Sequence, residues 1–76
     1  MDEDALFAVG SVLAAMAGLL ERKGICPAME VAETIGSVAT MTRESGEEYA
    51  GRAAYLGSWA LMVRAAALGA GGSQHN

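Results

Sequence analysis

The segment between Ser45 and Gly69 limits most strongly how this chain can fold. It opens with Ser45-Gly46-Glu47-Glu48, the pattern of a capping box, in which the serine caps a helix and the last glutamate reaches back to it. Apolar residues then recur at spacings of three and four, and they form the heptad seam Tyr49, Ala53, Leu56, Ala60, Val63 and Ala67. Apolar side chains occupy nearly every side of this segment, which is typical of a helix buried on more than one side. We therefore predict a helix over residues 46–68 that packs against more than one neighbour.

A first helix is predicted over residues 2–23. Asp2 is a good N-cap, and Lys23-Gly24 has the pattern of a C-terminal stop. The large apolar residues of this helix share one arc, whereas the opposite face carries small residues at four-residue spacing, namely Gly10, Ala14 and Gly18. Such a small-residue face allows another helix to approach closely, and the Ala-rich third helix suits it.

A second helix is predicted over residues 27–43, with Pro27 at its first position. Several β-branched residues and the internal Gly36 weaken it, so we expect a shorter or a broken element. The predicted fold class is therefore all-α, a small three-helix bundle in which two long helices flank a shorter or broken one. We assign one helical domain to residues 1–69 and a flexible tail to residues 70–76.

The chain has only 76 residues, and a domain of this size is marginally stable without a partner. We therefore predict that the bundle is completed by self-association as a homodimer or by docking on another protein. Aromatic and Met side chains are typical of interface cores, and the predicted interface is Tyr55, Trp59, Met62 and Arg64. Arg64 is included because no acidic residue lies three or four positions from it. The alternative for Trp59 is a place in the core of the monomer.

The sequence has few residues that could carry out catalysis. His75 lies in the predicted tail, where nothing would hold a general base in position. The sequence has no phosphate loop, nucleophile elbow or metal-ligand spacing, so we predict no enzyme, no metal and no cofactor. Cys26 is the only cysteine and precedes Pro27. It is either a reactive thiol near a helix N-terminus or a small apolar residue in a turn.

The stretch Leu19–Arg43 resembles the helix-turn-helix part of winged-helix regulators. Ala32 and Gly36 match the alanine four residues before the turn glycine of that family, and Ile35 matches the apolar residue before the glycine. The resemblance implies a degenerate helix-turn-helix over residues 28–45, with DNA contacts from Ser37, Thr40, Thr42 and Arg43. The turn is one residue shorter than in that family, and no wing follows.

The net charge of −4 argues against a protein that covers nucleic acid through a basic face. We predict a non-enzymatic, acidic helical protein that acts by protein–protein interaction as a regulator or inhibitor, of the kind found among phage and plasmid accessory proteins. A basic patch on a partner would meet an acidic face made of Glu30, Glu33, Glu44 and Glu47. A DNA-binding transcriptional regulator is the alternative. The apolar run from Ala5 to Leu20 is short for a membrane span and follows an acidic N-terminus, so we expect a cytoplasmic protein.

Overall fold

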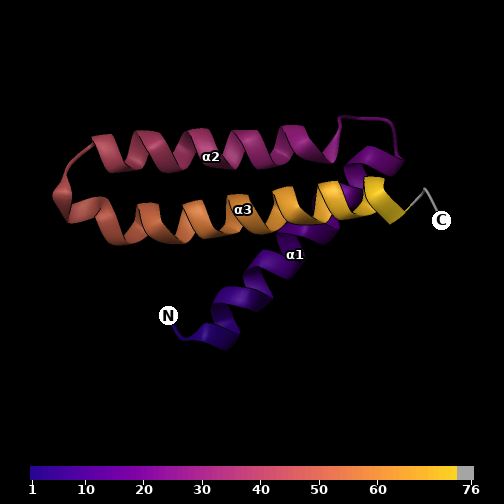
Figure 1. Ribbon diagram of the computed structural model, residues 1–76. Helices are drawn as coiled ribbons and strands as arrows, with labels where there is room; N and C mark the ends of the chain where they lie inside the picture. Colours follow the sequence, from indigo (N-terminus) through magenta and orange to yellow (C-terminus); the bar gives the residue numbers. More distant parts are fainter. Residues whose placement is uncertain (74–76) are drawn as a thin grey trace.

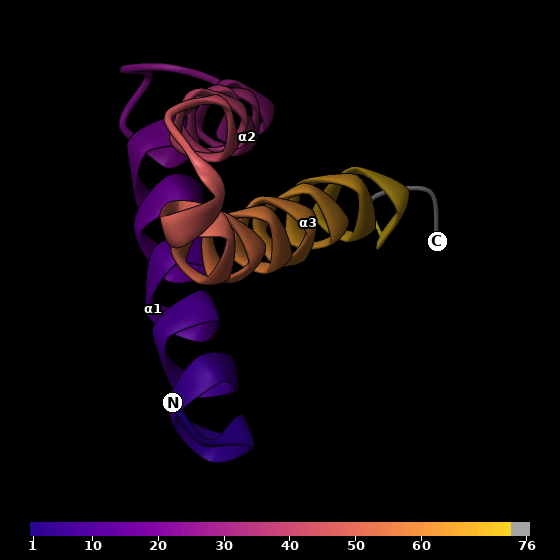
Figure 2. The ribbon, with the colours of Figure 1, turned by 90° about the vertical axis from the view of Figure 1, so that its left-hand side faces the viewer.

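The protein is a bundle of three helices in the computed structural model, which describes the backbone of residues 1–73 and the side chains of residues 1–69. The helices are α1 (Glu3–Arg22), α2 (Ala28–Glu44) and α3 (Ala50–Ser73), and a single 3₁₀ turn, η1 (Glu47–Tyr49), precedes α3. α2 and α3 run antiparallel as a hairpin, and α1 crosses α3 and extends away from it (Figures 1 and 2). The prediction of an all-α three-helix bundle is confirmed.

Both predicted signals at the ends of α1 are formed. The Ala5 N–H donates to the Asp2 carboxylate at 2.7 Å, which caps the first turn. At the other end Gly24 has a φ of 72°, and the Ile25 N–H donates to the Leu20 carbonyl at 2.9 Å. This is the Schellman arrangement that a glycine after the last helical residue allows.

α2 is the shortest of the three helices, with 17 residues, and it continues through Gly36 without a break. The capping box predicted at its far end is not formed. The Ser45 hydroxyl instead donates to the Met41 carbonyl at 2.9 Å and completes the last turn of α2. The chain then turns at Gly46, whose φ of 149° favours glycine.

α3 begins at Ala50 and continues through Gly69 to Ser73, beyond the end predicted from the sequence. An interior glycine costs a helix about 1 kcal/mol relative to alanine and does not by itself end it. The first residues of the predicted tail therefore continue α3, whereas residues 74–76, with His75 among them, lie outside the described part of the chain.

The core is small and consists mainly of alanine. Where the three helices meet, the buried cluster is Ala17, Ala28, Ala32 and Val63. Small side chains let the helix axes approach closely, and α1 meets α3 through its small-residue face, as the sequence predicts. Gly10 is buried there, beside the side chains of Met62 and Trp59.

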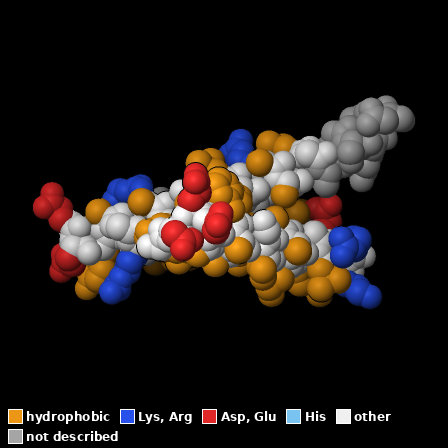
Figure 3. All heavy atoms as spheres, turned by 90° about the horizontal axis from the view of Figure 1, so that it is seen from below, with side chains coloured by type: hydrophobic (Ala, Val, Ile, Leu, Met, Phe, Trp, Pro, Cys, Tyr) orange, Lys and Arg blue, Asp and Glu red, His pale blue; other side chains and the backbone are white. Residues whose placement is uncertain are grey.

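Several large apolar residues of α1 lie on its outer face, whereas Leu6, Leu13 and Leu20 are half-buried. The exposed members are Val9, Val12, Met16 and Leu19. Seen from below, the molecule carries hydrophobic side chains at its surface in several places between charged ones (Figure 3). The bundle therefore leaves apolar surface uncovered.

Candidate functional site

A groove between α2 and α3 has a volume of about 530 Å³. All of the lining residues belong to these two helices, so the groove is formed without α1. The floor consists of small residues, including Ala32, Gly36, Ala39, Gly57 and Ala60. We call this feature the α2–α3 groove.

The groove is hollow because its floor carries nothing larger than a methyl group. A Cβ atom added at Gly36 would lie 3.9 Å from the Cβ of Ala60, and one added at Gly57 would meet nothing within 4 Å. At Gly36 and Ala60 the two helices therefore come close with only a methyl group between their backbones, and space is left above them. Leu61 stands beside this space with 69% of its surface exposed.

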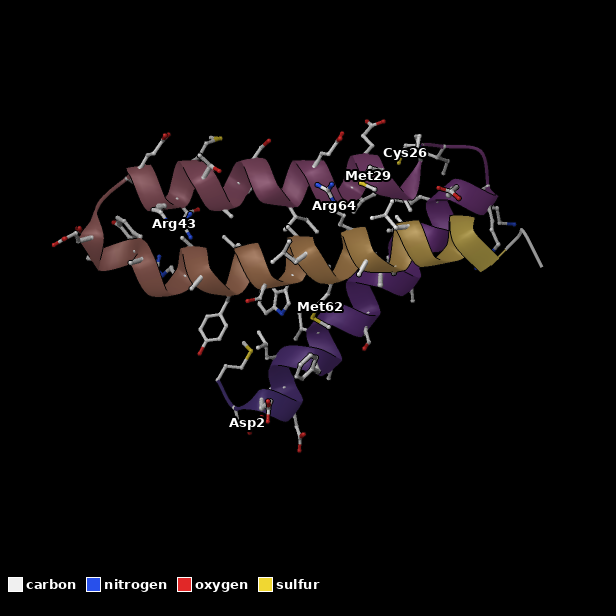
Figure 4. All side chains as sticks on the ribbon, in the orientation of Figure 1. Asp2, Cys26, Met29, Arg43, Met62 and Arg64 are labelled. Carbon is white, nitrogen blue, oxygen red and sulfur yellow. The ribbon has the colours of Figure 1, made fainter. Side chains whose placement is uncertain are left out.

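Charged side chains border the α2–α3 groove. Arg43 and Arg64 lie toward its two ends, with Met29 close to Arg64 (Figure 4). Glu33 also lines it. All three charged residues are exposed, and among the described side chains, residues 1–69, none of them forms an ion pair. The groove thus combines an apolar floor with charges of both signs at its edges.

The predicted aromatic stripe lies on a different side of α3 and faces α1. The Trp59 Nε1–H donates to the Leu6 carbonyl at 3.0 Å, and the Tyr55 ring stacks on the Trp59 ring with centroids 6.1 Å apart. Met62 packs beside Gly10. Tyr55, Trp59 and Met62 are all half-buried and lie where α3 meets α1. Arg64, the fourth residue of that set, lines the α2–α3 groove instead.

The predicted acidic face is exposed. Glu30, Glu33 and Glu44 project from α2, and Glu47 lies in η1. Among the described residues no group of three or more His, Cys, Asp or Glu side chains is placed to hold a metal ion. Of the four glutamates of the predicted acidic face, only Glu33 also lines the α2–α3 groove.

The helix-turn-helix predicted over residues 28–45 is not formed, because α2 passes through the expected turn as one helix. The Thr40 hydroxyl donates to the Gly36 carbonyl at 3.2 Å, as a mid-helix threonine does. Thr40 and Arg43 line the α2–α3 groove, whereas Thr42 is half-buried beside Tyr49 in a separate hollow. Ser37 is exposed and lines neither.

Cys26 is half-buried in the connection between α1 and α2. It borders a shallow hollow with Glu21, Ile25 and Pro27, and no other sulfur lies there. This position fits the interpretation of a small apolar residue in a turn.

Sequence reasoning did not single out Gly57 and Leu61 as a pair. The signal was present, because the two residues are one helical turn apart and lie away from both the heptad seam and the aromatic stripe. Which flank of α3 stays open, however, depends on where α1 and α2 pack.

Comparison with known proteins gives no relative for this chain: no family model, curated protein or solved structure matches it.

By length and composition, α1 is apolar enough to cross a membrane. The core helices of other proteins and signal sequences pass the same test.

Proposed function

We propose that this protein is a non-enzymatic docking module whose α2–α3 groove receives a helix from a protein partner. The observation that carries the proposal is the groove itself, an apolar hollow of about 530 Å³ that is lined by α2 and α3 and open to the surface. A helix lying in an apolar groove is a recurring mode of recognition between proteins.

The floor of the groove favours a helix as the occupant. Alanine and glycine residues on both α2 and α3 let a third backbone approach closely and gain many van der Waals contacts. The exposed Leu61 would lose contact with water at the same time, and each Å² of apolar surface removed from water contributes roughly 25 cal/mol.

The charges around the groove support a selective interaction. Glu33 favours a basic group on the occupant, whereas Arg43 and Arg64 favour acidic groups. Such complementarity mainly sets the rate of encounter and the orientation of the bound helix. A small protein that binds a helix of its target in this way is suited to the role of a regulator or inhibitor, which we propose here.

A photo-crosslinking experiment tests the proposal. A benzophenone amino acid replaces Leu61 in the groove or, as the control, Gly51, an exposed position on the same helix where an added Cβ meets nothing within 4 Å. In cells that express the protein, we expect irradiation to produce polypeptide adducts from position 61 only, and mass spectrometry to place the crosslink on a helical segment. Equal labelling from both positions would contradict docking in the groove.

The DNA-binding alternative makes an opposite prediction. A protein that binds through phosphate contacts retards duplex DNA at roughly 50 mM salt and loses the interaction as salt rises. We expect no retardation, because the charge is −4 and the predicted helix-turn-helix is not formed. A salt-sensitive shift would favour the alternative.

A further inference from the structure

We propose that the partner that covers the α2–α3 groove is a second copy of this chain, so that two α2–α3 hairpins pack face to face, α2 on α2 and α3 on α3, as an antiparallel four-helix bundle. This inference rests on the proposed docking function and names its partner. The groove carries the features of both the receiving and the inserted surface, which is what a two-fold interface requires.

The first such feature lies on α3. Leu61 is a large apolar side chain with 69% of its surface exposed, and Gly57, one turn earlier, has open space above its Cα. When two α3 helices cross antiparallel about a two-fold axis, Leu61 of each copy lies over Gly57 of the other. A projecting side chain then enters a hollow on both sides of the axis, as in knobs-into-holes packing.

The second feature lies on α2. Glu33 and Arg43 both line the groove, and neither forms an ion pair with a side chain of residues 1–69. An antiparallel two-fold between the α2 helices brings Glu33 of each copy toward Arg43 of the other. The proposed interface therefore contains two symmetry-related ion pairs, each between Glu33 of one copy and Arg43 of the other.

These two features require the same axis. The midpoint of residues 57 and 61 is residue 59, and the midpoint of residues 33 and 43 is residue 38. Gly36 lies level with Ala60, since a Cβ added at Gly36 would be 3.9 Å from the Ala60 Cβ. Because α2 and α3 run antiparallel (Figure 1), residue 38 is level with residue 58.

The two midpoints thus agree to within one residue, or about 1.5 Å along the helix. An unrelated helix would not require the hollow, the projecting leucine and the charges of this chain to match one another. Their common register favours a second copy as the occupant.

Assembly through this surface also supplies what the monomer lacks. Its fully buried cluster consists of alanines and one valine, and chains of this length bury a small share of their surface. Four helices around a shared apolar seam form a common and stable arrangement.

The substitution Gly57→Leu tests the inference by filling the hollow. Apart from the adjoining residues and backbone of α3 itself, nothing lies within 4 Å of the added Cβ, and leucine is a better helix former than glycine, so the monomer keeps its fold. We expect wild-type protein to show the mass of a dimer by sedimentation equilibrium between roughly 1 µM and 1 mM, and Gly57→Leu to stay monomeric. Gly51→Leu is the matched control on the same helix, also with open space, and should keep the dimer.

A charge reversal tests the register. Glu33→Arg places two like charges together in the proposed dimer and should weaken dimerisation by roughly tenfold. The double variant Glu33→Arg/Arg43→Glu restores opposite charges and should recover most of the loss. A double variant that dimerises more weakly than Glu33→Arg alone would contradict the antiparallel register.

The outcomes separate this inference from the proposed function. A wild-type protein that stays monomeric over the whole range, while position 61 crosslinks to a different polypeptide, overturns the second copy as partner and leaves the docking function standing. A monomer without any crosslink overturns both. A dimer that Gly57→Leu leaves intact places the interface elsewhere.

Discussion

At the scale of single residues, Trp59 makes one interaction within its own helix and one with α1. Its ring stacks on Tyr55 in α3, and its Nε1–H donates to the Leu6 carbonyl in α1 at 3.0 Å. A Trp at such a position contributes both apolar burial and one directional bond. The attachment of α1 to the hairpin therefore depends strongly on this one side chain.

The substitution Trp59→Phe keeps an aromatic ring but removes the hydrogen bond and part of the buried area. We expect the free energy of unfolding to fall by about 1–2 kcal/mol, measured by urea unfolding. Tyr55→Phe is the control, because the Tyr55 hydroxyl bonds are exposed, and it should cost less than about 0.5 kcal/mol. A Trp59→Phe variant that loses its dimer mass without losing stability would instead place Trp59 at an interface between chains, as the sequence predicts.

At the scale of helices, the start of α2 depends on a side chain from α1. Pro27 occupies the N-cap position and has no side-chain acceptor of its own. Glu21, seven residues before Ala28, takes this role, and its carboxylate accepts the Ala28 N–H at 2.7 Å. The cap thus joins the end of one helix to the start of the next.

Removal of this cap should weaken α2. For Glu21→Ala we expect a loss of about 1 kcal/mol in the free energy of unfolding, because one N–H of the first turn loses its acceptor. Glu21→Gln retains an oxygen at the same place and should recover most of this loss in the same urea experiment. Equal losses for both variants would show that the negative charge, rather than the hydrogen bond, stabilises the helix start.

Local signals explain which elements could be predicted from the sequence. Apolar periodicity indicates three helices, and Asp2 and Gly24 mark the ends of α1 because their effects need only neighbouring residues. The Glu21 cap spans seven residues across a turn, so its formation depends on the path of the chain. Ser45 fits two roles, and bonding back to Met41 completes α2 rather than starting α3. The groove depends on tertiary packing, which no local pattern specifies.

At the scale of the whole molecule, α1 crosses the hairpin with its small residues inward. Gly10 and Ala17 are buried against α3, whereas Val12 and Met16 are more than half exposed. Close backbone contact takes precedence here over burial of the largest side chains. The outer face of α1 also stays uncovered in the proposed dimer, since the α2–α3 groove contains no α1 residue.

This orientation of α1 predicts which substitutions in the helix the fold tolerates: polar replacements of its exposed large residues rather than enlargement of its buried small ones. Val12→Gln should change the free energy of unfolding by less than about 0.5 kcal/mol, because Val12 is 58% exposed. Ala17→Leu should cost about 1–3 kcal/mol, because Ala17 is 1% exposed and the added carbons have no space. The reverse order of the two effects in urea unfolding would mean that α1 packs with its large residues inward.

The contact between α1 and α3 contains the only tryptophan of the chain. Its fluorescence therefore reports on one contact, whereas far-ultraviolet circular dichroism reports on all three helices together. If α1 leaves the hairpin before the helices melt, the fluorescence transition precedes the dichroism transition; if the molecule unfolds as one unit, the two coincide. The sequence thus provides a built-in spectroscopic probe that distinguishes detachment of one arm from the loss of the whole fold.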